Sequence, residues 1–389
     1  MLCDRNECTG CLACLDSCPY KAIYIEYDEE GFFYPGIHEN LCRECGCCTR
    51  SCPILNKERV TTSGELTAYS AINLDKEALM KSSSGGVFDG LCRYVRKKSG
   101  MIAACCFDKE LKAIHSIISA SDDFDIFKGS KYVQSYTEGI YSKVKIELNS
   151  GTSVLFCGTP CQVAALNSFL AKTYDNLITI DFICHGVPSP KLWADYINYI
   201  ESEYGTILSY SFRDKRKYGW GLYYYYYYLD KKTSKRKGKG APETLDAYYH
   251  CFLTGQNYRN SCYNCRFANI NRPGDFTMGD LWGVNEDDYP DGASLLIVNT
   301  EKGRKLIEEL RSYLSINEYD FNAAVSSQHN LQSPTDRPEE RNNFYLNIRL
   351  HGIKSWVENY KKSRLYKRAL ISYSIPRNIK KGIKKLIAK

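Results

Sequence analysis

Two groups of four cysteines near the N-terminus carry the clearest chemistry in the sequence. Both have the spacing C-x2-C-x2-C-x3-C and are followed by a proline. The groups are Cys8, Cys11, Cys14 and Cys18 before Pro19, and Cys42, Cys45, Cys48 and Cys52 before Pro53. Cysteines two residues apart on a tight loop can hold three corners of a 4Fe-4S cubane, with a fourth thiolate from the other repeat. Zinc knuckles also use C-x2-C spacing and are the alternative, but the duplication with its closing Cys-Pro favours clusters.

This internal repeat resembles the bacterial two-cluster ferredoxin. The crossed use of the fourth cysteine assigns two sets of ligands. The first set is Cys8, Cys11, Cys14 and Cys52, and the second set is Cys42, Cys45, Cys48 and Cys18. Gly10 and Gly46 are expected where the backbone turns closely around each cluster. Cys47, beside Cys48, is expected to be a bystander.

Composition narrows the class of protein. Nineteen of the 389 residues are cysteine, and ten of these lie in the first sixty residues. A chain of this size without an apolar N-terminal signal is not a small secreted disulfide protein, so we expect a cytoplasmic location and metal-binding thiols. No apolar run approaches the length of a membrane-spanning helix. The net charge of +7 comes from the last 29 residues, which hold eleven Lys or Arg and no acid, so nucleic-acid binding is not expected.

The pattern of elements predicts an α+β protein with α/β layers in its central part. We expect a two-cluster 4Fe-4S domain over 1–60, a larger mixed domain over 66–330 and a basic helical tail over 331–389. In the central part, strands are predicted at 67–73, 152–156 and 177–183, with helices at 87–98, 162–172 and 192–204. A hairpin is predicted for 101–107 and 114–119. The tyrosine run 223–228 predicts a half-buried hairpin strand, with the basic residues 231–239 as its exposed tip.

Two loops of the central part have compositions suited to ligands. The first, Ser82-Ser83-Ser84-Gly85-Gly86, precedes a helix, so its small residues and free amides could approach a phosphate or an anionic flavin ring. An ordinary serine helix cap is the alternative. The second, Gly158-Thr159-Pro160-Cys161, lies where a strand ends and a helix begins. Ligands bind at this edge of such sheets.

Four further cysteines could form a third site. Cys161 and Cys184 follow two neighbouring predicted strands, and Cys262 and Cys265 form another C-x2-C pair. From the residues alone, a third cubane, a structural zinc site, a redox pair and buried free thiols all remain open. His185, beside Cys184, could donate a proton, or could be a satisfied polar residue in a tight turn.

Several blocks together make the chain similar to the coenzyme F-420 hydrogenase/dehydrogenase beta-subunit family. They span about residues 66–310, and with the N-terminal repeat the likeness covers most of the chain. The blocks are Lys81–Phe88, Gly129–Ser135, Phe156–Gln162, Cys184–Pro190, Cys262–Phe267 and Gly279–Gly283.

The resemblance implies a bound FAD beside a 4Fe-4S cluster. The serine-rich turn and Lys131 would contact the flavin, and Gly158, Thr159 and Pro160 would flank it. The inner cluster would be held by Cys161, Cys184, Cys262 and Cys265. The chain would then be an FAD- and iron–sulfur-dependent oxidoreductase that passes electrons between ferredoxin-type clusters and FAD, with His185 as a catalytic candidate.

The resemblance leaves the substrate and partners open. Family members act on different acceptors, including a deazaflavin and a chlorophyll side-chain alcohol, so coenzyme F-420 is one candidate small molecule among several. Ferredoxin or a partner redox enzyme would exchange electrons with the N-terminal clusters. No G-x-G-x-x-G follows a strand, so a nicotinamide site is not predicted. The alternative is a non-catalytic electron-transfer subunit that serves a partner enzyme.

The C-terminal end has an amphipathic basic pattern over 379–387. This segment could contact an anionic membrane surface or an acidic partner, or could be solvated.

Overall fold

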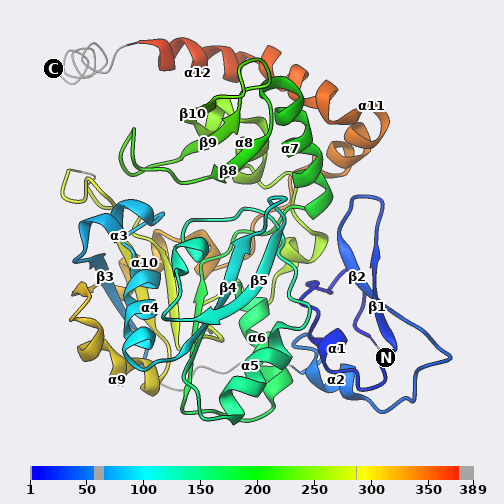
Figure 1. Ribbon diagram of the computed structural model, residues 1–389, viewed down its shortest axis with the longest axis vertical. Coiled ribbons are helices and arrows are strands. Elements are labelled where there is room, and N and C mark those ends of the chain that lie inside the picture. The colour runs from blue at the N-terminus through cyan, green and yellow to red at the C-terminus, as the bar shows by residue number, and fades with distance from the viewer. Residues whose placement is uncertain (1, 57–64, 286, 376–389) are drawn as a thin grey trace.

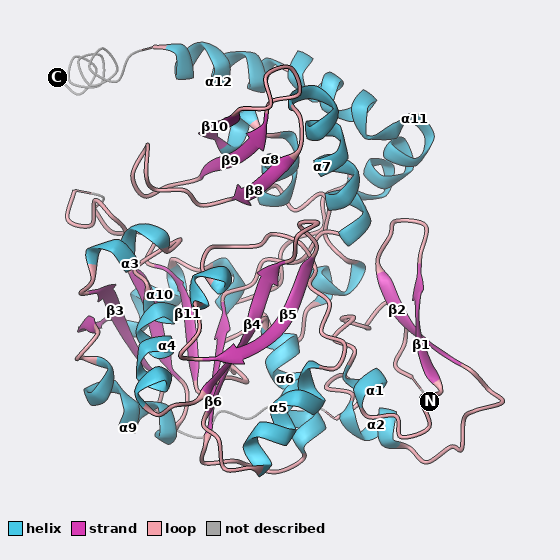
Figure 2. Ribbon diagram, viewed as in Figure 1, coloured by secondary structure: helices cyan, strands magenta, loops and turns pink. Residues whose placement is uncertain are grey.

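The computed structural model describes residues 2–56, 65–285 and 287–375 of the chain. The described residues form a small N-terminal unit, a central layered unit around an eight-stranded mixed sheet, and a unit in which helices pack on a three-stranded sheet (Figures 1 and 2). This mixture of layers confirms the predicted α+β class.

The N-terminal unit is a pair of short helices and a two-stranded ribbon. Its elements are α1 (Ala13–Asp16), β1 (Ile23–Tyr27), β2 (Phe33–Ile37) and α2 (Cys47–Ser51). β1 and β2 are antiparallel. α1 and α2, one from each cysteine repeat, lie side by side, and the Ser51 hydroxyl bonds the Ser17 hydroxyl at 2.9 Å. The two cysteine repeats therefore form one compact structure.

The central sheet has the strand order β13-β3-β12-β11-β7-β6-β4-β5. Its strands are β3 (Thr67–Asn73), β4 (Met101–Phe107), β5 (Ala113–Ser119), β6 (Val154–Gly158), β7 (Leu177–Phe182), β11 (Phe276–Asp280), β12 (Ser294–Val298) and β13 (Leu314–Tyr319). β4, β6, β7 and β11 are parallel neighbours, whereas the outer pairs are antiparallel. The parallel strands place their carboxyl ends at one edge, where ligands bind in sheets of this kind.

Helices cover both faces of this sheet. They are α3 (Lys76–Lys81), α4 (Val87–Lys97), α5 (Ile140–Asn149), α6 (Pro160–Leu170), α9 (Glu301–Leu310) and α10 (Phe321–Ser326). α4 and α9 share one core cluster with side chains of the sheet, and α5 and α6 share another. The predicted helix over 87–98 is confirmed, because its apolar side chains Val87, Leu91 and Val95 are fully buried in the first cluster.

The third unit combines a three-stranded antiparallel sheet with four helices. Its elements are β8 (Ile207–Ser211), β9 (Tyr223–Leu229), β10 (Arg236–Pro242), α7 (Pro190–Tyr204), α8 (Ala247–Leu253), α11 (Arg341–Lys362) and α12 (Arg364–Ser374). Short 3-10 helices occur at Phe124–Phe127, Glu243–Leu245, Asn260–Asn264 and His329–Leu331. The tyrosine strand is half-buried as predicted, but the basic run 231–239 is only partly a hairpin tip, since residues 236–239 belong to β10. The pairing of Tyr225 and Tyr227 with Gly240 and Gly238 extends the ladder into that run.

The C-terminal residues that the structure describes are helical, and α11 packs on α7 and α8. Phe344, Tyr345 and Val357 of α11 are buried in the core of the third unit. The amphipathic pattern over 379–387 lies outside the described residues. None of the helices that the structure describes is long and apolar enough to cross a membrane.

Candidate functional site

A cavity of about 270 Å³ opens at the carboxyl ends of β4, β6, β7 and β11. It receives side chains from most of the blocks that the sequence singled out. The predicted cofactor residues that line it are Ser82, Ser83, Ser84, Gly86, Lys131, Gly158 and Thr159, with Cys161, Cys184 and His185. Gly85 and Pro160 lie within the same two loops. The structure therefore brings together, in one cavity, segments that are more than a hundred residues apart in the chain.

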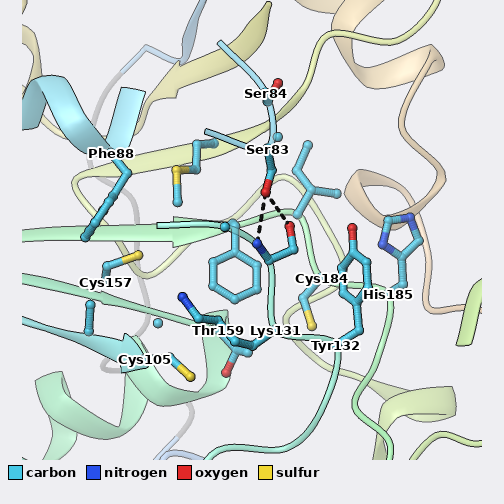
Figure 3. Close-up of a pocket in the computed structure, with 18 of the residues that line it drawn as sticks. Ser83, Ser84, Phe88, Cys105, Lys131, Tyr132, Cys157, Thr159, Cys184 and His185 are labelled. Atoms are coloured by element: carbon cyan, nitrogen blue, oxygen red, sulfur yellow. Dashed lines mark hydrogen bonds between the residues drawn. The ribbon is translucent and has the colours of Figure 1, made fainter. Parts of the chain in front are cut away.

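The serine-rich turn forms one wall of this cavity and is tied to the segment that carries Lys131. The Ser83 hydroxyl accepts hydrogen bonds from the backbone N–H and the hydroxyl of Ser130, each at 2.9 Å (Figure 3). Gly85 donates its N–H to the Ser294 hydroxyl at 2.8 Å, and a Cβ at Gly85 would lie 2.0 Å from the carbonyl oxygen of Ala71. The turn thus needs glycine there because the backbone of β3 approaches it closely.

Lys131 points its ammonium group into the protein beside this wall. Its Nζ donates to the carbonyl oxygens of Phe127 and Lys128, both at 2.8 Å. Burial lowers the pKa of Lys131 from its ordinary value, with nearby thiols opposing the shift. Figure 3 shows Lys131 between Cys105 and Cys157, two cysteines that also line the cavity. Lys131 therefore offers a cation or a hydrogen-bond donor to a bound group.

A buried chain of hydrogen bonds holds the Gly158–Cys161 loop from below. His115 on β5 donates from Nε2 to the carbonyl oxygen of Cys157 at 3.2 Å and accepts at Nδ1 from the Ser135 hydroxyl at 3.0 Å. Gln162 donates to that hydroxyl at 3.0 Å, and its Oε1 accepts the N–H of Thr159 at 2.9 Å. Burial lowers the pKa of His115 to about 4, so the imidazole is neutral at pH 7. In this series of hydrogen bonds, every polar atom named has a partner only while His115 is neutral.

The four inner cysteines meet beside the cavity. Burial, followed by the charge of a neighbouring cysteine, raises the pKa of Cys161 to about 11 and that of Cys262 to about 12. The same two causes, with all three other cysteines as neighbours, raise the pKa of Cys184. Backbone N–H groups bond the sulfurs of Cys184 and Cys265. The four thiols are therefore buried near one another, and their burial disfavours ionisation.

A buried ion pair fixes the segment that carries Cys262 and Cys265. Arg272 donates from Nη2 to the Asp181 carboxylate at 2.7 Å, and both side chains are almost fully buried. Asp181 belongs to β7, the strand that leads to Cys184. This pair therefore joins the two chain segments that must meet at the inner cysteines.

The N-terminal cysteines line a second, smaller cavity. The residues of the first predicted set, Cys8, Cys11, Cys14 and Cys52, all face it, together with Cys3 and Cys48. Cys3 hydrogen-bonds Cys8 and Cys52 and so lowers their pKa values to about 6 and about 7. Of the second predicted set, Cys45 is exposed, and Cys18 and Cys42 are partly exposed. All four members of the first set thus face the smaller cavity, whereas the second set includes the exposed Cys45.

Gly10 and Gly46 both have the left-handed backbone that the sequence predicts for them, with φ of +65° and +71°. The close neighbours of Gly10 are, however, the side chains of Gln134 and Arg259 from the larger unit. Among residues 2–56, 65–285 and 287–375, no three or more His, Cys, Asp or Glu side chains are arranged to hold one metal ion.

Side chains of the larger unit hold the backbone of the first cysteine loop. The hydroxyls of Thr137 and Tyr141 both donate to the carbonyl oxygen of Cys11 at 2.7 Å, and Gln134 donates to that of Thr9 at 3.2 Å. Ile54, Ala164 and Phe267 form one apolar cluster, and Cys52 of the first set and Cys161 and Cys265 of the inner set all pack against it. The first N-terminal set and the inner set are therefore neighbours across this interface.

His185 lines the cavity and remains accessible from it (Figure 3). The protein around it lowers the pKa of its imidazole, and the Asp280 carboxylate opposes that shift. Asp280 lies on the same cavity wall and is held by Arg213, whose Nη1 donates to it at 2.6 Å. His185 therefore faces the cavity with its pKa lowered, which favours the neutral ring.

Sequence reasoning missed several residues that shape these sites: His115, Ser135, Gln162, Asp181, Arg259 and Arg272. One of them had a readable signal, because Asp181 is a lone charge inside an apolar strand, where it requires a partner. Arg259 and His115 had none, since each is unremarkable among its neighbours in sequence. Cys157, the residue before Gly158, also lines the large cavity.

Two family models match separate parts of the chain. Residues 151–322 match the family model for the C-terminal part of the coenzyme F420 hydrogenase/dehydrogenase beta subunit, and residues 7–55 match the model for a 4Fe-4S dicluster domain. Residues 151–322 therefore form a C-terminal domain of the coenzyme F420 hydrogenase/dehydrogenase beta-subunit family, and residues 7–55 form a 4Fe-4S dicluster domain. The chain is an iron–sulfur electron-transfer protein of oxidoreductase type, which confirms the resemblance predicted from the sequence.

Individual relatives are similar over shorter stretches. The VorC subunit of ketoisovalerate oxidoreductase from Methanothermobacter marburgensis is 34% identical over 55 residues, which is 14% of this chain and 70% of that protein. Ferredoxin-type protein NapF of Escherichia coli K12 is 35% identical over 52 residues, which is 13% of this chain and only 32% of NapF. A chain of the F420-reducing NiFe hydrogenase complex from Methanosarcina barkeri aligns with a TM-score of 0.45 and 16% identity, over 70% of this chain and 91% of that chain.

Proposed function

We propose that this chain is an iron–sulfur flavoprotein oxidoreductase. It would hold two 4Fe-4S clusters in its N-terminal domain (1–60), and a third cluster with FAD in its larger domain (66–330). Electrons would pass between the clusters and the flavin, and between the flavin and a small-molecule substrate. The observation that carries this proposal is the single cavity whose wall combines the serine-rich turn, Lys131 and the Gly158–Thr159 loop with two of the inner cysteines, Cys161 and Cys184.

The donor atoms fit iron–sulfur clusters. Thiolate sulfur is the ligand that such clusters prefer, and N–H groups directed at the sulfurs are part of how proteins adjust their potentials. Backbone amides of this kind reach Cys8, Cys11, Cys184 and Cys265. At the inner site the four thiols are buried together, so a positive iron–sulfur core would supply the charge that their ionisation requires.

The lining of the large cavity offers both apolar and polar contacts that a flavin would use. Flat apolar contact is available from Phe88 and Trp282, and hydrogen-bond donors come from Lys131 and the loop amides. A flavin, when bound, exchanges two electrons with organic molecules and single electrons with clusters. The residues of this chain would orient such a ring beside Cys161 and Cys184, and His185 would offer a neutral imidazole to a substrate on the same wall.

The route of electrons follows from which cysteines face inward. The second N-terminal set, with Cys45 exposed, is the one that a ferredoxin or a partner redox enzyme can approach. The first set is held by Thr137 and Tyr141 against the larger unit and neighbours the inner set. We therefore place the second set outermost, the first set between, and the inner set next to the cavity.

Anaerobic purification with analysis of iron, sulfide and flavin tests this proposal. Three cubanes and one flavin predict about twelve irons and one FAD per chain. A colourless protein, or one with zinc in place of iron, would refute it. Reduction of the bound flavin by a small molecule in the isolated chain would support an enzyme, whereas a flavin that exchanges electrons only with protein partners would identify the alternative, a non-catalytic electron-transfer subunit.

A further inference from the structure

Arg259 is one of the three largest side chains with no more than 2% exposure, and it lies at the interface between the N-terminal unit and the larger unit. Its Nε donates to the carbonyl oxygen of Cys8 at 2.7 Å, and its Nη1 donates to that of Phe33 at 3.0 Å. The guanidinium also lies 4.0 Å above the ring of Tyr34. Its Nη2 is buried and has no hydrogen-bond partner among the residues that the structure describes.

The charge of Arg259 is not compensated by a carboxylate in the described part of the chain. The other two arginines of this size and burial both have one: Arg272 bonds Asp181 at 2.7 Å, and Arg341 bonds Glu30 at 2.6 Å. An unpaired buried charge is costly, and guanidinium does not lose its proton to avoid that cost. Arg259 therefore needs a negative group that is neither an aspartate nor a glutamate.

The groups around Arg259 that can become negative are thiols of two different cysteine sets. Its guanidinium bonds the carbonyl oxygen of Cys8, in the first N-terminal set, and its backbone N–H bonds the carbonyl oxygen of Val187, three residues after Cys184 of the inner set. The chain itself fixes part of this arrangement, because the N–H of Cys262 bonds the carbonyl oxygen of Arg259 at 2.9 Å. One cation is thus shared between the two sets.

We propose that Arg259 is a positioning residue that serves as the shared counter-cation of the first N-terminal cluster and the inner cluster. This inference rests on the proposed function, since it requires clusters at both sets. A cubane with four thiolates is an anion that becomes more negative on reduction, so a fixed cation beside it favours the reduced state. Arg259 therefore raises the reduction potentials of both clusters together, and leaves the outer second set less affected.

Potentiometric titration followed by electron paramagnetic resonance, on the anaerobic cluster-loaded chain, tests this role. Arg259→Met removes the charge. Gln134→Glu places a carboxylate beside it, because the Gln134 Oε1 is already 3.2 Å from the Arg259 Nη1. Both changes should lower the reduced-to-oxidised ratio of the first N-terminal cluster and of the inner cluster about tenfold at a fixed potential. A tenfold change corresponds to a shift of 59 mV in the reduction potential of a one-electron couple. Arg259→Lys, which keeps the charge, should stay within about twofold of the unmodified chain.

Gln134→Ala is the matched control, since it also loses the hydrogen bond to the carbonyl oxygen of Thr9 but adds no charge. Equal potentials in these two variants would overturn the proposal, as would a tenfold shift in Arg259→Lys. If Arg259→Met fails to load clusters, the comparison of Gln134→Glu with Gln134→Ala decides the question. Iron analysis of the unmodified chain separates a failure of the proposed function from a failure of the role of Arg259. A chain without iron refutes the proposed function. Unshifted potentials in an iron-loaded variant refute the role of Arg259 alone.

Discussion

The buried imidazole of His115 gives a quantitative test of how the cavity loop is held. The pKa of His115 is lowered to about 4 by burial, whereas a histidine in the unfolded chain has a pKa of 6.5. Between these two pH values the unfolded chain binds a proton that the folded chain does not. Stability therefore falls as the pH drops below 6.5, and the loss is complete near pH 4. At pH 5.5, one unit below the unfolded value, this histidine costs about 1.4 kcal/mol, and the full shift corresponds to about 3 kcal/mol.

His115→Gln removes this titration but keeps a polar side chain. Urea unfolding of the anaerobic chain, followed by near-ultraviolet circular dichroism at pH 7.5 and pH 5.5, measures the effect. At pH 7.5 the variant should be less stable, because it breaks the bonds to Cys157 and Ser135. At pH 5.5 the gap between the two proteins should narrow by about 1.4 kcal/mol. His351→Gln, at an exposed position on α11, should leave the gap unchanged.

A gap that stays constant between the two pH values would refute the reasoning, because it would mean that His115 already carries a proton in the folded chain. The Nδ1–H of His115 would then donate to the Ser135 hydroxyl, and the proton of that hydroxyl would need another acceptor.

Three further changes test other parts of the structure. Cys161→Ser should remove about four of the twelve expected irons, measured by iron and sulfide analysis, whereas Cys157→Ser should leave the iron content unchanged. Arg272→Met should lower the free energy of unfolding by about 3–5 kcal/mol, since it leaves a buried carboxylate unpaired. The exposed Arg311→Met should change it by less than about 1 kcal/mol in the same urea titration. Ser83→Ala should raise the dissociation constant for FAD about tenfold in a fluorescence titration, because the wall of the cavity loses two hydrogen bonds, and an unchanged constant would place the flavin elsewhere.

The N-terminal cysteine motifs and most elements of the central sheet could be predicted because their signals are local. A C-x2-C-x2-C loop carries its ligand spacing within seven residues, and the strand at 67–73 and the helix at 87–98 show their periods directly in the sequence. The extent of the basic hairpin tip was wrong for a related reason. Lysine and arginine within 236–239 gave no strand signal, and only pairing with the tyrosine strand makes that segment β10.

The sequence by itself therefore determined which residues can bind sulfur-rich clusters, the class of fold and the family. Only the tertiary structure decided which N-terminal cysteines line the smaller cavity, and that Cys161 and Cys184 line the large one. The compensation of a buried charge is likewise invisible along the chain: Arg259 lies 251 residues from Cys8, yet bonds its backbone. Burial and charge compensation depend on neighbours that different strands and helices supply. These neighbours are far apart in the sequence, so only the folded structure shows them.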